Sequence, residues 1–289
     1  MICIYHSKDL DGQGSAAIIK RKFKGVELIG YDYGDPLPRL RPNDPLIIVD
    51  VSFPMDVMLK MSEERGMNLT WIDHHIKSIR EYEQFMKERK DTFCITHVED
   101  GLAACELTWD FLFPNEPLPK AISLIGMYDV VRKGVNWETE VLPFQFGMRA
   151  ICSSPDEFPE VLLGNDGLAL AMVDDIIRKG RHILQYIKKT EEFSMKRGAF
   201  EAEFLGMRAL CLNASSYSFM SFASQWDNSK HDIAVGFFYD GRKWMGSIYT
   251  DRQDVDCNEL ARKLGGGGHR KASGFVVDDI FAKGFTSLP

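Results

Sequence analysis

Short apolar runs alternate with helical patterns through the first half of the chain. The runs predict strands at 2–5, 26–31, 46–51, 69–72 and 92–96. Between and after them, apolar residues recur at helical spacing and predict helices at 14–24, 55–65, 77–89, 102–113 and 118–130. This alternation is typical of a parallel sheet with helices on both faces. The predicted fold class is therefore α/β, with a doubly wound, mostly parallel sheet.

The pattern changes after a long predicted helix. That helix covers about 166–195, and beyond it the chain predicts a smaller α/β domain. Asp240-Gly241 indicates a hairpin between two apolar runs, and Gly265 ends a capped helix at 257–264. The predicted organisation is a catalytic domain, a helical linker and a substrate-binding domain, at 1–165, 166–195 and 196–289.

Composition restricts the classes of protein that fit. The formal net charge of −7 over 289 residues does not suit a protein that grips long nucleic acid through a broad basic surface. No apolar run approaches the ~18 residues that a membrane span needs, and the N-terminus does not read as a signal peptide. Six cysteines without a C-x-x-C pair indicate buried, reduced thiols, so we expect a cytoplasmic protein with no membrane partner.

Polar residues follow several predicted strands of the first domain. His6 follows the first strand, Asp50 lies near the end of the third, and Asp73-His74-His75 follows the fourth. Ligands of open α/β sheets bind beyond the carboxyl ends of the strands. The sequence therefore predicts that these groups share one rim of the sheet.

Each of these segments has two interpretations when it is taken alone. His6, Asp9 and Asp11 suit hard divalent ions, but a polar loop with an aspartate helix cap also fits. Asp50 is either paired with a cation in a buried run or lies just past the strand and bonds to backbone. The two histidines point in different directions and need not share a role. Asp129 ends an apolar stretch and is a weak signal by itself.

A glycine-rich segment near the C-terminus is locally basic. Four glycines at 265–268 precede His269, and the stretch from Arg262 to Lys271 has four basic and no acidic residues. Such a segment exposes backbone N–H groups and lets an anion approach closely, although a flexible turn is the alternative.

The order of these elements resembles the DHH phosphoesterases that carry a DHH-associated C-terminal domain. His-x-x-Asp-x-Asp-Gly comes first, then a strand-end Asp, Asp-His-His, a helix-borne Asp and Gly-Gly-Gly-Gly-His. The Asp-Leu-Asp-Gly form of the first motif is most similar to the nanoRNase, or oligoribonuclease, branch. The resemblance covers essentially the whole chain.

The resemblance implies a role for each matching residue. Asp73 would orient the site and His75 would contact the scissile phosphate. A terminal phosphate or ribose would be held across an interdomain cleft by Gly266, Gly267, Gly268, His269 and Arg270. Two divalent ions, with manganese expected first and magnesium or cobalt as alternatives, would be bound by His6, Asp9, Asp11, Asp50, His74 and Asp129. In this set His6 and Asp9 serve one ion, Asp11, His74 and Asp129 serve the other, and Asp50 bridges both.

The activity implied is two-metal hydrolysis of short RNA oligonucleotides to nucleoside 5′-monophosphates. Other substrates in the same enzyme class are 3′-phosphoadenosine 5′-phosphate, linear or cyclic dinucleotides and inorganic polyphosphate. A different class is a nucleotide-binding regulator with a degenerate site, which the complete ligand set disfavours. The oligomeric state is left open.

Overall fold

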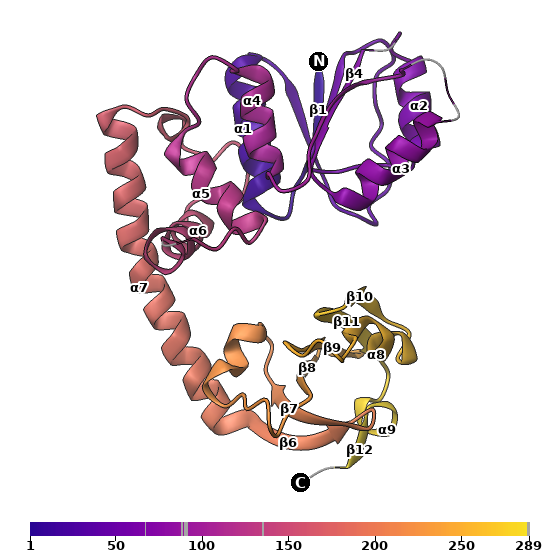
Figure 1. Cartoon of the computed structure of the whole chain (residues 1–289), viewed down its shortest axis with the longest axis vertical. Helices are drawn as coiled ribbons and strands as arrows, with labels where there is room; N and C mark the ends of the chain where they lie inside the picture. The colour runs from indigo at the N-terminus through magenta and orange to yellow at the C-terminus, as the bar shows by residue number, and fades with distance from the viewer. Residues whose placement is uncertain (67, 88, 90–91, 135, 288–289) are drawn as a thin grey trace. The chain divides into compact units, whose positions relative to one another are not determined.

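The computed structural model divides the chain into two compact units, Met1–Leu184 and Gln185–Pro289 (Figure 1). It describes residues 1–287 except 67, 88, 90, 91 and 135. No helix of the described residues is long and apolar enough to cross a membrane. All six cysteines are buried and free, as expected from their apolar sequence surroundings.

The first unit is built on a five-stranded parallel sheet in the order β2-β1-β3-β4-β5. Its strands are β1 (Ile2–His6), β2 (Glu27–Tyr31), β3 (Leu46–Val49), β4 (Leu69–Asp73) and β5 (Ile95–Val98). Every residue of β3 is buried, as a central strand covered on both faces requires. The predicted α/β class is confirmed, and the fifth strand begins later than predicted.

Helices cover both faces of this sheet. One core packs α1, α4 and α5 with the sheet, and a second core packs α2 and α3 against its other face (Figure 1). The helices of this unit are α1 (Leu10–Lys22), α2 (Met55–Glu63), α3 (Ile76–Lys87), α4 (Ala104–Leu112), α5 (Lys120–Asp129) and α6 (Leu142–Arg149), with a π-helix η1 (Trp137–Val141) and a 3-10 helix η2 (Glu160–Leu163). The predicted helix at 77–89 corresponds to α3, and position 88 lies outside the described residues.

The long helix α7 (Gly167–Gly198) begins in the first unit and ends in the second. Two glycines let it cross α6 at close range. A Cβ at Gly180 would lie 1.7 Å from the Pro143 carbonyl oxygen, and one at Gly147 would lie 2.5 Å from that of Ile176. This close backbone contact fixes the N-terminal half of α7 to the first unit.

The second unit contains a seven-stranded mixed sheet in the order β10-β11-β9-β8-β7-β6-β12. Only β7 and β8 pair in parallel among its described strands. The elements are β6 (Ala199–Phe204), β7 (Met207–Asn213), η3 (Phe219–Ser224), β8 (Ile233–Tyr239), β9 (Trp244–Tyr249), α8 (Cys257–Lys263), β10 (Gly267–His269), β11 (Ala272–Val277), α9 (Ile280–Lys283) and β12 (Phe285–Ser287).

Local chemistry explains the hairpin and the capped helix that the sequence indicates in this unit. Asp240 accepts backbone hydrogen bonds from Arg242 and Lys243 at 2.7 Å, and Gly241 has a φ of +96°. Asp256 caps α8 by accepting from the first-turn amides.

Candidate metal centre

The turn from β1 into α1 places three of the predicted ligands. His6 ends β1, and Asp9 caps α1 by accepting the Gly12 N–H at 3.0 Å through Oδ1. The other carboxylate oxygen, Oδ2, lies 2.8 Å from His6 Nδ1. Asp11 falls inside the first turn of α1, which begins four residues earlier than the predicted helix.

Asp50 lies directly after β3 with its backbone in the left-handed region, at a φ of +58°. This conformation is uncommon for a non-glycine residue and typically persists where function holds it. Its N–H donates to the Ile72 carbonyl at 3.0 Å, and its side chain is buried. Of the two interpretations from sequence, Asp50 lies past the strand end, yet its Oδ2 is buried without a hydrogen bond.

Asp73, the last residue of β4, organises the two histidines that follow it. Its Oδ1 accepts the backbone N–H of His74 at 2.7 Å and that of His75 at 3.2 Å. The same oxygen lies 2.7 Å from Nδ1 of the His75 ring. The carboxylate thereby fixes the His75 ring through Nδ1 and leaves Nε2 for another partner. The His75 side chain remains 41% exposed.

The His74 ring points to a different group of carboxylates. Its Nε2 lies 3.6 Å from Asp11, 3.4 Å from Asp129 and 3.4 Å from Asp50. Asp11 is fully buried and accepts the amides of Ala104 and Cys105 at 2.8 and 2.7 Å, at the N-terminus of α4. Asp129 is the last residue of α5. The structure thus brings together side chains from α1, from α5 and from the ends of β3 and β4.

Three donor groups lie close together among the described residues, and two of them match the predicted ligand sets; the third combines Asp50, Asp73, His74 and His75. His6, Asp9 and Asp50 form the first, and Asp11, His74 and Asp129 form the second; in each group the ligand atoms lie within 4.8 Å of one another. Asp50 faces both, because Oδ2 lies 3.6 Å from His6 Nδ1 while Oδ1 lies 3.4 Å from His74 Nε2. His6 Nδ1 and Asp50 Oδ2 are buried without a hydrogen bond of acceptable geometry. Buried donors that converge without bonding one another are what a cation requires.

Comparison with known proteins agrees with this geometry. Residues 1–135 match the model of the DHH family, N-terminal domain. Over these residues the chain is similar to the N-terminal domain of DHH-family proteins. Proteins of this family are metal-dependent phosphoesterases, and the donor groups of this chain are residues that could hold metal ions.

Relatives and solved structures extend the likeness beyond the DHH domain. Uncharacterized protein R106 of Acanthamoeba polyphaga mimivirus is 25% identical over 96% of this chain and 68% of its own length. The pGpG-specific phosphodiesterase PggH from Vibrio cholerae is 14% identical, covers 97% of this chain and 94% of its own, and has a TM-score of 0.56. The DHH domain of a member of a family of ribosomal proteins is 14% identical over 96% of this chain and 82% of its own, with a TM-score of 0.53. These two structures show a shared fold.

The carboxylates of the site raise the pKa values of the two histidines in the donor groups. The neighbouring carboxylates of Asp50 and Asp9 raise the pKa of His6 to about 10. Burial lowers the pKa of His74, but Asp50, Asp11 and Asp129 outweigh it and raise that pKa to about 9. Burial raises the pKa of Asp129 to about 6. At neutral pH both rings are therefore protonated before a cation binds, and metal binding releases those protons.

An ion pair that the sequence did not reveal fixes part of the DHH site. Arg132 donates to both carboxylate oxygens of Glu106, at 3.1 and 2.7 Å, and also to the Gly101 carbonyl. The buried Glu106 belongs to α4, whose first amides hold Asp11, while Arg132 lies three residues after Asp129. The pair thereby joins the supports of two ligands in the second group. In the sequence, the signal for this pair was Glu106, an acidic residue within the largely apolar run 102–113.

The sequence predicts that the C-terminal glycine segment exposes its backbone N–H groups, but several of them are hydrogen-bonded within the second unit. The N–H groups of Gly265 and Gly266 donate to Arg262 and Ala261, and that of Gly268 donates to the Asn258 side chain at 3.2 Å. Close packing explains the glycines better, since a Cβ at Gly266 would lie 2.1 Å from the Gly274 carbonyl oxygen.

The predicted substrate residues of this segment lie at the surface of the second unit. Gly267, Gly268 and His269 form the exposed strand β10. The guanidinium of Arg270 donates to the Gln253 carbonyl. Their role toward substrate stays a prediction.

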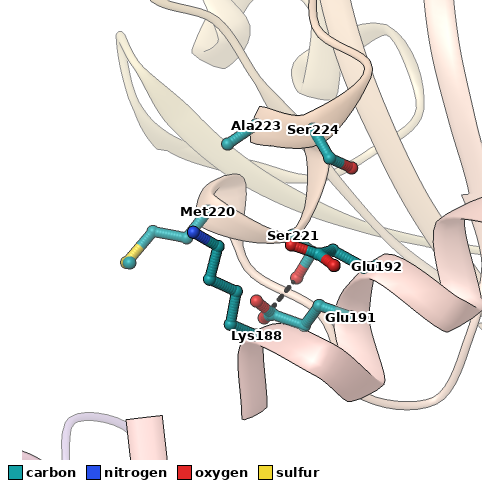
Figure 2. Close-up of a pocket in the computed structure, with 7 residues that line it drawn as sticks. All are labelled: Lys188, Glu191, Glu192, Met220, Ser221, Ala223 and Ser224. Carbon is teal, nitrogen blue, oxygen red and sulfur yellow. Dashed lines mark hydrogen bonds between the residues drawn. The ribbon is translucent and has the colours of Figure 1, made fainter. Parts of the chain in front are cut away.

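The second unit also contains a pocket between α7 and η3 (Figure 2). Ser221 donates to Glu191 across it at 2.7 Å, and Lys188 and Glu192 line it on the α7 side. The Glu191 carboxylate is thus engaged in holding η3 to α7. The residues that line this pocket do not include any predicted site residue.

Proposed function

We propose that this DHH phosphoesterase hydrolyses short RNA oligonucleotides to nucleoside 5′-monophosphates with two divalent ions, manganese first. The observation that carries the proposal is Asp50, whose two carboxylate oxygens face one donor group each. A single carboxylate shared by two such groups is the arrangement that a two-ion site needs. When bound, paired divalent ions activate water and neutralise charge on a phosphoryl group during in-line displacement.

The chain's own residues supply orientation and a proton. Asp73 holds the His75 ring through Nδ1, so Nε2 is available to donate to a phosphoryl oxygen. The Asp73 hydrogen bond raises the pKa of His75 to about 8, which keeps the ring protonated at neutral pH. His75 therefore serves as a positioned cation and proton donor beside the reacting phosphate. We infer that His269 and Arg270 of the second unit, with the glycines at 266–268, contact a terminal phosphate or ribose.

Two observations favour a short substrate. A net charge of −7 does not favour a long basic surface, and each phosphate contact on an extended strand needs a cation. The structural neighbour PggH is a phosphodiesterase specific for pGpG, a dinucleotide, and shares the fold over 97% of this chain. Both support a substrate of a few nucleotides over a long chain.

A substrate panel tests the proposal directly. The metal-free protein is supplied with Mn²⁺, Mg²⁺ or Co²⁺ and given an RNA dimer, a pentamer and a chain of about 25 nucleotides, together with 3′-phosphoadenosine 5′-phosphate and polyphosphate. We expect kcat/KM to fall with length and the products to be nucleoside 5′-monophosphates. Turnover of the bisphosphate or polyphosphate alone would contradict the proposed substrate class.

Metal analysis of a variant tests the bridging carboxylate. Asp50→Asn keeps the volume of the side chain but removes the charge that both groups share, so we expect fewer than two Mn²⁺ per chain and loss of turnover. The control is Asp227→Asn, which changes a half-buried aspartate of the second unit that accepts hydrogen bonds from Ser229. Two ions in both variants would contradict the bridging role.

A further inference from the structure

Tyr33 is an exposed aromatic residue beside the first donor group. It follows β2 in a turn that is held by Asp32, whose Oδ1 accepts the Tyr33 N–H at 2.8 Å and whose carbonyl accepts the Asp35 N–H at 3.0 Å. More than half of the Tyr33 side chain, 53%, is accessible to solvent. Most exposed tyrosine rings are free to move, and this one is fixed at both ends.

The far end of the Tyr33 side chain is fixed by the loop after β3. Its hydroxyl oxygen accepts the Ser52 N–H at 3.3 Å, and Ser52 in turn shares a 2.7 Å hydroxyl contact with Ser78 of α3. Because β2 and β3 flank β1 in the sheet, the phenol ring crosses the carboxyl end of β1. His6 ends that strand, and the two ring centroids are 6.1 Å apart at an angle of 52°.

We propose that Tyr33 is a stacking platform for a nucleobase of the substrate, and that it makes the site selective for nucleotides over inorganic phosphate chains. The proposal rests on the proposed function for its reaction. The Tyr33 ring is accessible and lies 6.1 Å from the His6 ring of the first donor group, so it provides a flat apolar surface beside the proposed reaction centre. Stacking of this kind accepts any base, because every base presents a π-face.

Rigidity is the second part of the argument. A ring that is already held by Asp32 and Ser52 loses little conformational entropy when a base binds. Polyphosphate presents no aromatic face, so it gains nothing from Tyr33. The ring therefore favours binding of a nucleotide substrate over binding of a phosphate chain, although both present a phosphoryl group to the metal centre.

The test pairs a variant with a substrate that lacks a base. Tyr33→Leu and Tyr33→Phe are compared with wild type on an RNA dinucleotide and on the same dinucleotide carrying an abasic ribose at either position. Tyr186→Leu, which alters another exposed tyrosine, on α7, is the matched control. Thermal unfolding of each variant shows that the fold is kept.

We expect Tyr33→Leu to lower kcat/KM on the dinucleotide by about 10- to 100-fold, mainly through KM, and to leave one abasic substrate almost unaffected. Tyr33→Phe keeps the ring and loses only the bond to Ser52, so its loss is smaller. An equal loss on the normal and both abasic substrates would overturn the proposal, and so would a Tyr33→Phe loss as large as that of Tyr33→Leu.

Equilibrium binding separates this proposal from the proposed function. If wild type cleaves no dinucleotide, the proposed function fails, and Tyr33 is then judged by calorimetric binding of AMP and of ribose 5-phosphate. The platform requires that Tyr33→Leu weakens AMP binding about tenfold or more and leaves ribose 5-phosphate binding unchanged. Equal affinity of wild type and Tyr33→Leu for AMP would overturn it.

Discussion

A methyl group added at Gly12 should impair metal binding and activity much more than it lowers the stability of the fold. A Cβ there would lie 2.0 Å from the His6 carbonyl oxygen and 2.8 Å from its carbon, where ordinary contact begins at 3.4 Å. Gly12→Ala must therefore move the end of β1 and the first turn of α1 apart by about 1.4 Å, and these segments carry His6, Asp9 and Asp11.

The magnitude follows from two opposing terms. Forced overpacking costs about 1–3 kcal/mol, and the better helix propensity of alanine returns about 1 kcal/mol. The net loss of about 0–2 kcal/mol lowers Tm by only a few degrees in a protein of this size. A misplacement of about 1 Å among catalytic groups, in contrast, costs on the order of 100-fold in rate. Activity should fall far more than stability.

Gly14 provides a matched control in the same helix. A Cβ at Gly14 would meet Cys105, Ile125 and Ile122 at 3.6 to 3.8 Å, which is ordinary contact. Gly14→Ala should therefore keep full activity and gain up to about 1 kcal/mol of stability. The assays are Tm, Mn²⁺ content and kcat for both variants. Equal metal content and kcat in the two would refute the argument from backbone contact.

Two further predictions concern residues around the second donor group. Glu106→Gln keeps the shape of the side chain but loses the charge paired with Arg132. We expect weaker Mn²⁺ binding and a loss of about 1–2 kcal/mol in the free energy of unfolding, a small value because Arg132 is partly exposed. Unchanged Mn²⁺ affinity would contradict a positioning role for Glu106. His74→Ala should lower metal content and abolish turnover, whereas His75→Ala should keep the metal and lower kcat, because the two rings face different partners; elemental analysis with kinetics checks this, and equal metal loss would contradict it.

The sequence predicts the sheet better than it predicts the start of α1. The buried run of β3 and the strand-end polar residues indicate a parallel sheet and its functional edge directly. The predicted helix at 14–24 begins late, because Asp11 and Gln13 are buried polar residues in the first turn and break the amphipathic pattern that marks a helix. Polar residues on the buried face of a helix thus hide the amphipathic pattern from which the helix would be predicted.

Features that depend on distant contacts could not be predicted in this way. Glu106 and Arg132 are 26 residues apart, and neither has a local signature that names the other. Tyr33 lies in an ordinary polar turn, and its place over β1 depends on the strand order β2-β1-β3. The short helix α6 contains Pro143 and Gly147, which read as breakers, and only its close crossing with α7 explains the glycine.

The carboxylates of the DHH site reach their positions by two physical routes. Asp9, Asp11 and Asp73 accept backbone amides, so hydrogen bonds orient them whether or not an ion is bound. Asp50 follows the other route, because its left-handed backbone directs the side chain while Oδ2 stays buried without a hydrogen bond.

Both features of Asp50 oppose folding, since a strained φ costs about 1–3 kcal/mol and a buried carboxylate oxygen without a hydrogen bond adds a desolvation cost. A fold retains such a residue where a ligand offsets the cost. Among these four carboxylates, the one that the chain supports least faces both donor groups, and cations shared between them would supply the missing stabilisation.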